Sequence, residues 1–254
     1  MTPQSKPIPI IEIFGPVIQG EGIMAGHQTM FIRTGGCDFR CVWCDTPEAV
    51  IPEQVSVNKT MMTTFDIMDK IREIGPYTKW VTISGGNPAI HDMGELVHAL
   101  HVSGRLVAVE TQGTIYRSWF DIVDVMTISP KPPSSGMKVS WDKTQDFIVR
   151  SMTRGNGGKT CIKVVVFDED DFTFAHDLRM LFLLNEDFYV QPGTIRPEDV
   201  AADVDPRLAM NYLRGAILDK TRWLTERVLS TPDMAGVKVM PQLHALMYGW
   251  RRGV

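Results

Sequence analysis

The chain of 254 residues lacks the features that mark membrane, secreted and nucleic-acid-binding proteins. No apolar run is long enough to cross a bilayer, and no signal peptide is recognisable. The formal net charge is -4, so there is no excess of basic residues to bind a phosphate backbone. We therefore expect a cytoplasmic protein that acts on a small molecule and has neither nucleic acid nor membrane as a partner.

Cysteine is also scarce, with 4 residues in the chain. We do not expect a disulfide framework, because the chain is long and clusters its cysteines as metal sites do. Cys161 opens the apolar run CIKVVVF, and we expect it in the core. Cys37, Cys41 and Cys44 instead fall together in GCDFRCVWCDT, with the spacing C-x3-C-x2-C. Three thiols in one loop indicate a shared metal site.

The cysteine loop offers three thiolates and no fourth. Structural zinc sites and ordinary ferredoxin clusters use four protein ligands. Only Asp38 and Asp45 near the triad could complete such a set, so a zinc module or an electron carrier stays an alternative. A [4Fe-4S] cluster held by three cysteines keeps one iron open, and S-adenosylmethionine (SAM) can bind there. An activase that makes a glycyl radical on another protein is a further alternative, but the chain has no cysteine-rich insert for it.

Strand-like and helix-like runs alternate along the chain, without a linker or a low-complexity segment. We expect helices near 64–74, from 93, from 168 and over 206–229. The strand candidates are 29–34, 79–84, 105–110, 123–129, 162–167, 187–191 and 236–242. Repeated β-α units predict an α/β protein with a parallel sheet.

Polar or glycine-rich motifs follow one strand candidate after another. GGNP (85–88) follows the second candidate, Glu110 ends the third, Lys131 follows the fourth between prolines, and His244 follows the last. The carboxyl ends of parallel strands meet at one edge, which is where an α/β barrel builds its site. Each motif alone is usually a turn, a surface charge or a core-edge residue, but their repetition favours one shared site.

Two further residues near the cysteine loop carry chemistry. Arg33 lies inside the first strand candidate, where an unpaired charge is costly. We expect it to pair with a carboxylate of Glu21, Glu110 or the substrate. Thr46 directly follows the last cysteine, and its hydroxyl is either a helix cap or a ligand.

Six segments together resemble 7-carboxy-7-deazaguanine synthases of the radical SAM superfamily. They are EIFGPVIQGEG, GCDFRCVWCDT, TISGGNPA, ETQGT, ISPKPPSSGM and PQLHALMYGWRRGV, in this order from about residue 10 to the C-terminus. One departure is Asn87 in GGNP, where the superfamily commonly has Glu before the proline.

The resemblance implies a partial (β/α) barrel formed by a single radical SAM domain over 1–254. The cluster loop spans about 34–48, and a C-terminal segment of about 236–254 closes the substrate pocket. The implied reaction is a lyase step that converts 6-carboxy-5,6,7,8-tetrahydropterin to 7-carboxy-7-deazaguanine, with ring contraction and loss of ammonia, in queuosine and 7-deazapurine biosynthesis. The implied cofactors are a [4Fe-4S] cluster, SAM and Mg²⁺, and the partners are flavodoxin or ferredoxin as reductant and a second copy in a homodimer.

The resemblance also implies a role for individual residues. The cluster ligands are Cys37, Cys41 and Cys44, and the Mg²⁺ ligand is Thr46. The SAM contacts are Trp43, Cys44, Asp45, Gly86, Ser129, Pro130 and Lys131. The substrate contacts are Ile18, Gln19, Gly20, Arg33, Ser84, Glu110, His244 and Val254. No catalytic side chain is expected beyond these, because the SAM-derived radical carries the chemistry.

Overall fold

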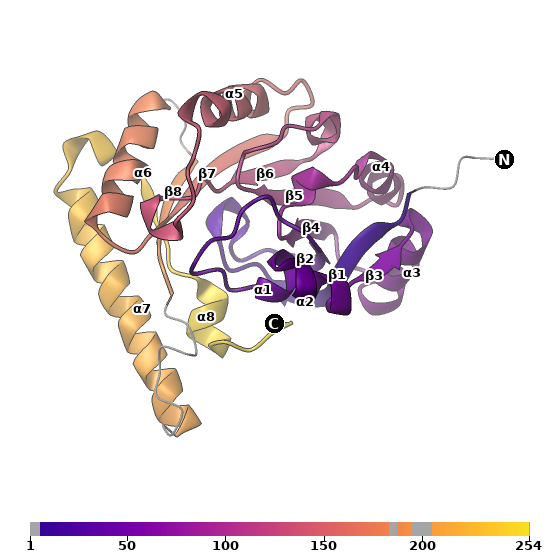
Figure 1. Cartoon of the computed structure of the whole chain (residues 1–254), viewed down its shortest axis with the longest axis horizontal. Helices are drawn as coiled ribbons and strands as arrows, with labels where there is room; N and C mark the ends of the chain where they lie inside the picture. The colour runs from indigo at the N-terminus through magenta and orange to yellow at the C-terminus, as the bar shows by residue number, and fades with distance from the viewer. Residues whose placement is uncertain (1–5, 183–186, 195–204, 254) are drawn as a thin grey trace.

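One nine-stranded sheet forms the centre of the computed structural model, which describes residues 6–182, 187–194 and 205–253 (Figure 1). The strand order is β3-β1-β2-β4-β5-β6-β7-β8-β9. The strands are β1 (Ile8–Ile18), β2 (Gln28–Thr34), β3 (Thr60–Met62), β4 (Trp80–Gly85), β5 (Leu106–Thr111), β6 (Val125–Ile128), β7 (Lys159–Val166), β8 (Phe188–Pro192) and β9 (Lys238–Val239). Within the described residues the end strands β3 and β9 do not pair with each other. The sheet is therefore an open, partial barrel, which confirms the predicted fold class.

Neighbouring strands from β2 to β9 are parallel, whereas β1 runs antiparallel to both β2 and β3. The strand β1 was not predicted, and the cysteine loop follows the second strand of the chain instead of the first. Pro9, Gly15 and Pro16 interrupt the strand signal of β1, and its pairing with β2 shows register shifts near these positions. Proline and glycine are tolerated at such irregularities of strand pairing, and they hide the alternating pattern of a regular strand.

The helices are α1 (Pro47–Val50), α2 (Pro52–Asn58), α3 (Thr64–Ile74), α4 (Gly94–Val102), α5 (Trp141–Met152), α6 (Glu169–Leu181), α7 (Pro206–Leu229) and α8 (Leu243–Tyr248). The helices α3 to α7 cover the outer side of the sheet (Figure 1), whereas α1 and α8 contribute residues to its inner side. The helix α3 packs on β1, α4 on β5, α5 and α6 on β7, and α7 on β8 and β9. In the described part of the chain, no helix is both long and apolar enough to span a membrane.

Local signals place two of the predicted helices. Thr63 and Asp66 form a capping box at the start of α3, and Gly75 ends the helix as expected. Asp168 caps α6, whose first turn is acidic and suits the positive end of the helix dipole. The amphipathic helix α5 was not predicted.

Strand alternation separates the core from the inner face of the sheet. Fully buried aliphatic side chains that belong to the main core are Ile32, Ile83, Val109 and Ile162. Successive side chains of a strand point to opposite faces, so the residue after each of these faces the inside of the barrel. These inner residues are Arg33, Ser84, Glu110 and Lys163. The same alternation that builds the core therefore carries four polar side chains into one interior.

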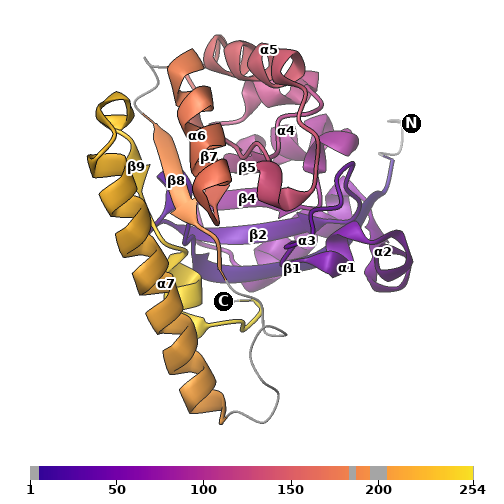
Figure 2. The ribbon, with the colours of Figure 1, turned by 60° about the vertical axis from the view of Figure 1, so that its left-hand side comes forward.

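The C-terminal part of the chain returns to the first strands. The first turns of α7 extend past the sheet (Figures 1 and 2), and the C-terminal segment reaches α1 through an ion pair between Arg252 and Glu48. A small apolar cluster of Leu213, Ile217 and Ala245 joins α7 to α8, with Met210 and Leu246 packed against it. This cluster holds the last helix at the open side of the barrel.

Candidate active site

A cavity of about 480 Å³ lies inside the curve of the sheet. Cys37, Gly86 and Lys131 all line it, so motifs from three different strand ends meet at one rim as predicted. The predicted site residues in its wall are Ile18, Gln19, Gly20, Arg33, Cys37, Cys41, Trp43, Cys44, Asp45, Thr46, Ser84, Gly86, Glu110, Ser129, Lys131 and His244. Pro130 is buried and does not line the cavity. Val254 lies outside the described residues.

The three cysteines of the loop are half-buried in the cavity wall. The Cys37 Sγ accepts hydrogen bonds from the backbone N–H of Phe39 at 3.4 Å and from Gln112 Nε2 at 3.6 Å. Burial raises the pKa of all three thiols, and that of Cys44 to about 11. Without metal the raised pKa favours the protonated thiols, whereas a bound metal favours the thiolates, because a coordinating thiol is deprotonated.

The geometry of the loop differs from that of a single-metal site. Among the described residues, no three His, Cys, Asp or Glu side chains converge so as to hold one metal ion. In an iron–sulfur cubane each cysteine binds a different iron, so the sulfurs surround the cluster instead of converging on one point. Three half-buried cysteines in the wall of one cavity suit a cluster that three thiolates hold.

The two acidic residues beside the triad have other partners. The carboxylate of Asp38 accepts from Asn87 Nδ2 at 2.8 Å, Gln112 Nε2 at 2.5 Å and Thr114 Oγ1 at 2.6 Å. Asp45 accepts from the hydroxyl of the next residue. The Asp38 contacts also explain the unusual residue in GGNP, because Asn87 can donate to a carboxylate where an ionised Glu could not.

The glycine pair of this motif allows the end of β4 to touch the cysteine loop. Gly85 has φ +138°, a conformation that side chains rarely adopt. A Cβ on Gly86 would lie 2.2 Å from the carbonyl oxygen of Gly36. The strand end and the loop are thus in backbone contact, and the two glycines present no side chain of their own to the cavity.

A chain of contacts links the other side of the cysteine loop to α6. Lys131 lies 3.2 Å from Ser129 Oγ and 5.8 Å from the ring centroid of Trp43. The indole Nε1 of Trp43 donates to Ser134 Oγ at 3.0 Å, and this hydroxyl donates to Asp171 Oδ2 at 2.6 Å. Asp171 is fully buried, although nothing in the sequence pattern distinguished it from the acidic turn around it.

Arg33 pairs with a residue that was not expected. Its Nε donates to Glu12 Oε1 at 2.6 Å, and its partner is neither Glu21 nor Glu110. The two residues are cross-strand neighbours in the β1–β2 pair, so the missed strand explains the missed partner. A second nitrogen, Nη1, lies 3.4 Å from Thr46 Oγ1.

The Thr46 hydroxyl does not serve as a helix cap. Thr46 precedes α1, but its side chain makes no capping hydrogen bond. It donates instead to Asp45 Oδ1 at 2.8 Å. The hydroxyl and this carboxylate place two oxygens side by side, which is the ligand type that Mg²⁺ prefers.

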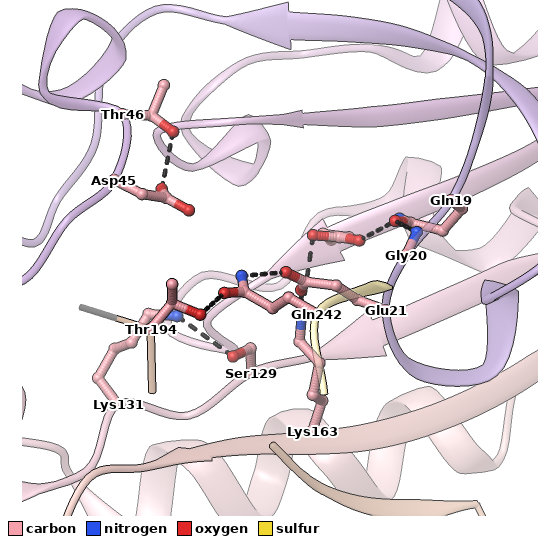
Figure 3. A network of polar contacts seen from close by, with 11 residues as sticks. Gln19, Gly20, Glu21, Asp45, Thr46, Ser129, Lys131, Lys163, Thr194 and Gln242 are labelled. Carbon is pink, nitrogen blue, oxygen red and sulfur yellow. Dashed lines mark hydrogen bonds and ion pairs between the residues drawn. The ribbon is translucent and has the colours of Figure 1, made fainter. Parts of the chain in front are cut away.

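A polar network fills the opposite wall of the cavity (Figure 3). Lys163 of β7 pairs with Glu21 and lies 4.0 Å from Glu110 Oε2. The other oxygen of Glu110 accepts from Gln19 Nε2 at 2.7 Å. Gln242 Nε2 donates to Glu21 Oε1 at 2.5 Å. The network joins the β1–β2 connection, β5, β7 and the segment that follows β9.

Burial and charge act in opposite directions in this network. Burial alone raises the pKa of Glu21, but Lys163, His244 and Gln242 together lower it to about 2. Burial alone lowers the pKa of Lys163, yet Glu21 and Glu110 raise it above its ordinary value. The pair is therefore held in its ionised form although it is removed from water.

The C-terminal segment lies against the first turn of the chain. The backbone N–H of Leu243 donates to the Gly20 carbonyl at 3.1 Å, and a Cβ on Gly20 would lie 2.8 Å from the backbone nitrogen of His244. Farther along, Arg252 binds both carboxylate oxygens of Glu48 in α1, at 2.6 and 3.1 Å. Gly20 thus has a packing role beyond that of a turn.

Several cavity residues were missed by the sequence analysis. They are Glu12, Lys163, Gln191, Thr194 and Gln242. Lys163 carried a usable signal, since a cation inside an apolar strand needs a partner, as was argued for Arg33. Gln191 is buried, and its Oε1 has no hydrogen-bond partner among the described residues. An acceptor of this kind in a cavity wall suits a ligand that donates a hydrogen bond.

Comparison with known proteins agrees with the fold and the cysteine loop. The model of the radical SAM superfamily matches residues 31–158, half of the chain. The fold and the site thus define a radical SAM enzyme, and this class binds a [4Fe-4S] cluster and SAM.

Curated relatives narrow the class to one family. The 7-carboxy-7-deazaguanine synthase of Bacillus cereus is 40% identical over 97% of this chain and 99% of its own length. That of Bacillus subtilis is 37% identical over 98% of this chain and 100% of its own length. The chain belongs to the 7-carboxy-7-deazaguanine synthase family.

Solved structures support the architecture. QueE from Escherichia coli has a TM-score of 0.62 at 23% identity, covering 93% of this chain and 94% of that chain. Streptococcus suis SuiB bound to S-adenosylmethionine has a TM-score of 0.53 at 15% identity, covering 84% of this chain and 50% of that chain. At these identities the two likenesses show the fold alone.

Proposed function

We propose that this chain converts 6-carboxy-5,6,7,8-tetrahydropterin to 7-carboxy-7-deazaguanine, as a radical SAM lyase of queuosine and 7-deazapurine biosynthesis. Family membership supports the reaction, and the cavity supports the substrate. The observation that most directly supports this proposal is that one cavity contains both the three-cysteine loop and two polar regions. One of these regions surrounds Arg33 and the other surrounds Glu110. The substrate likewise has a carboxylate and a donor-rich, guanidine-like edge, which need opposite partners.

The cofactor half of the cavity is assigned to the cluster and to SAM. Cys37, Cys41 and Cys44 are the proposed cluster ligands, and Gly86 and Lys131 are proposed SAM contacts because they line the same cavity. When bound, these groups supply a carbon radical that removes hydrogen from the substrate. The other predicted SAM contacts are Trp43, Asp45, Ser129 and Pro130, and the last of these acts by fixing its neighbours, because it does not line the cavity. The chain's own task is to orient SAM and to exclude water.

Thr46 is the proposed protein ligand of Mg²⁺. Its hydroxyl is buried in the cavity wall, beside the Asp45 carboxylate. Mg²⁺ keeps several waters and is often held by few protein oxygens together with a substrate. In this proposal the Thr46 hydroxyl is one ligand of Mg²⁺, and oxygens of substrate and water are the other ligands.

The substrate half of the cavity holds the pterin. Arg33 faces the substrate carboxylate with the guanidinium nitrogens that Glu12 leaves free to donate. Glu110 accepts hydrogen bonds from the guanidine-like edge. The remaining proposed contacts are Ile18, Gln19, Gly20, Ser84, His244 and Val254.

We assign the whole chain, 1–254, to one radical SAM domain with its cluster loop at about 34–48. The segment of about 236–254 closes the substrate pocket, which the contacts of Leu243 and Arg252 with the first part of the chain support. A homodimer, a flavodoxin or ferredoxin reductant and a cytoplasmic location complete the proposal, and they rest on the family alone.

Anaerobic turnover tests the function directly. Protein reconstituted with iron and sulfide is given SAM, a reductant, Mg²⁺ and the carboxytetrahydropterin. The expected result is 7-carboxy-7-deazaguanine and ammonia in equal amounts, from protein that shows iron and visible absorbance. Iron-loaded protein that leaves the pterin unchanged refutes the substrate, whereas zinc in place of iron refutes the class.

A further inference from the structure

Lys163 is a buried cation to which the proposed reaction assigns no role. It lies on β7 with its side chain 6% exposed, and it belongs to no motif of the family resemblance. Its ammonium pairs with Glu21 and lies 4.0 Å from Glu110 Oε2. Burying an ammonium is costly unless it is paired, so its position at a ligand cavity calls for an explanation.

We propose that Lys163 is a positioning residue that determines specificity, because it holds Glu21 and Glu110 as an ionised, acceptor-only wall that selects the donor-bearing edge of the substrate. The inference rests on the proposed function and deepens it. Lys163 acts through Glu110 and is not itself assigned a substrate contact.

The first argument is charge balance. When ionised, Glu21, Glu110 and Lys163 together carry one net negative charge. The remaining amide groups at this wall are neutral, and Gln19 and Gln242 each direct an N–H toward a carboxylate. An edge with adjacent N–H donors, such as the guanidine-like edge of the substrate, would donate hydrogen bonds to this negatively charged wall. A carbonyl at the same place would face carboxylate oxygens and lack a donor.

The second argument is geometric. One oxygen of Glu110 is held by Gln19 at 2.7 Å, and the other faces the ammonium. The Glu110 side chain is still 23% exposed, so it remains accessible from the cavity. Contacts on both oxygens limit rotation of the carboxylate, which fixes its lone pairs before a ligand arrives.

The third argument concerns the protons of the network. The groups that face Lys163 are Glu21, Glu110 and Cys161, and His244 acts on Glu21. Without the ammonium, two carboxylates would share a buried wall, and like charges there favour the uptake of a proton. A protonated carboxylate donates one hydrogen bond, so the wall would begin to accept a ligand that offers a carbonyl.

The test compares two ligands under anaerobic conditions by calorimetry, without turnover. One is 6-carboxy-5,6,7,8-tetrahydropterin, and the other is its 2-oxo analogue, in which a carbonyl replaces the exocyclic amine. The proteins are the wild type, Lys163→Met, Lys163→Arg and the double variant Lys163→Met/Glu21→Gln. The double variant replaces both members of the ion pair with uncharged residues. It leaves no unpaired buried charge from this pair and is therefore more apt to fold than the single variant. Lys238→Met is the matched control, since Lys238 pairs with Asp187 at 2.7 Å outside the cavity.

We expect the wild type and Lys238→Met to prefer the amino ligand strongly. Lys163→Met and the folded double variant should bind it on the order of 30-fold more weakly, in line with the loss of a charged hydrogen-bonding partner. In Lys163→Met the preference over the 2-oxo ligand should narrow, most of all at lower pH, and Lys163→Arg should restore most of it. The double variant keeps only one of the two carboxylates, so its preference should narrow less. A folded double variant with unchanged affinity for the amino ligand overturns the role of Lys163 alone. A wild type that binds neither ligand and forms no product overturns the proposed function together with it.

Discussion

The two walls of the cavity are built by different means. The cofactor wall is local, because Cys37, Cys41 and Cys44 come from a single loop that two glycines allow to lie on β4. The substrate wall is assembled from the β1–β2 connection, β5, β7 and the C-terminal segment (Figure 3).

The two walls also differ in the interactions that order them. The cysteine loop is held mainly by backbone contacts and by the hydrogen bonds of Asp38. The substrate wall depends on a buried ion pair, in which loss of either partner leaves a charge without compensation. The comparison teaches that chain neighbours group the three cluster ligands, whereas the substrate wall and the proposed SAM contacts at Gly86 and Lys131 require the finished fold.

The largest expected effect is in the cysteine loop. Replacing Cys37, Cys41 or Cys44 with Ala should abolish the cluster and the activity together, because the one other cysteine of the sequence, Cys161, is buried in the core and cannot replace the lost ligand. Iron content and visible absorbance of anaerobic protein measure the first, and product formation the second. The control Cys161→Ala should keep both, since Cys161 is a fully buried core residue of β7. Loss of the cluster in that control would place a fourth ligand in the site.

The next effect concerns the ion pair of the substrate wall. Glu21→Gln leaves Lys163 without its main partner and should lower the free energy of unfolding by about 3 kcal/mol near neutral pH. The folded protein lowers the pKa of Glu21 from 4.5 to about 2, so the stabilisation is complete above the ordinary pKa. It should be lost as the pH falls from about 4.5 toward 2.

Urea unfolding across this pH range checks the sign. The difference between wild type and Glu21→Gln should stay constant above pH 5 and narrow in acid. If the difference in free energy of unfolding were the same at every pH, the contact with Lys163 would not be what lowers the pKa of the Glu21 carboxylate.

A third effect distinguishes the two polar regions of the substrate wall. Arg33→Lys should lower turnover by about 2 kcal/mol, or roughly 30-fold, because an ammonium cannot keep Glu12 and also offer a planar fork. SAM affinity should stay nearly the same. Measuring turnover and SAM binding side by side with Glu110→Gln sharpens the result. Near-normal turnover in both variants would remove these residues from the pterin site.

A smaller effect should appear at the cofactor wall from a distant residue. Asp171→Asn weakens the hold on Ser134, whose hydroxyl accepts from the Trp43 indole. We expect SAM to bind severalfold more weakly and the free energy of unfolding to fall by about 1 to 2 kcal/mol. Equilibrium binding and urea unfolding measure these changes, and the exposed Asp170 of the same helix provides the control Asp170→Asn. Unchanged SAM affinity in Asp171→Asn would mean that Asp171 only stabilises the loop around Ser134 and does not affect SAM binding.

A further modest effect concerns the stimulation by Mg²⁺. Thr46→Ala should reduce the stimulation of turnover by Mg²⁺ about tenfold, while SAM binding survives. Thr46→Ser keeps the hydroxyl and should behave like the wild type. An unchanged Mg²⁺ dependence in Thr46→Ala would show that the Thr46 hydroxyl only makes hydrogen bonds with Asp45 and Arg33 and does not bind Mg²⁺.

Much of the fold and of the cofactor wall was predictable. The strand candidates from 29–34 onward match β2 and β4 to β9, and the motifs at their ends line one cavity. The substrate wall was predicted in part, through Gln19, Arg33, Glu110 and His244. Glu12 was missed together with β1, whose prolines and glycine hide the strand pattern. Asp171 was missed because its partner lies 37 positions away in the chain.

The sequence by itself determined the cysteine spacing, the alternation that separates core from interior, and the glycines that permit close contact. These are local properties, since each depends on residues within one loop or strand. Only the tertiary structure decided that Arg33 pairs with Glu12 and that Lys163 meets Glu21 across 142 positions. Such pairs follow from strand register and from the return of the C-terminal segment, and no short-range pattern encodes them.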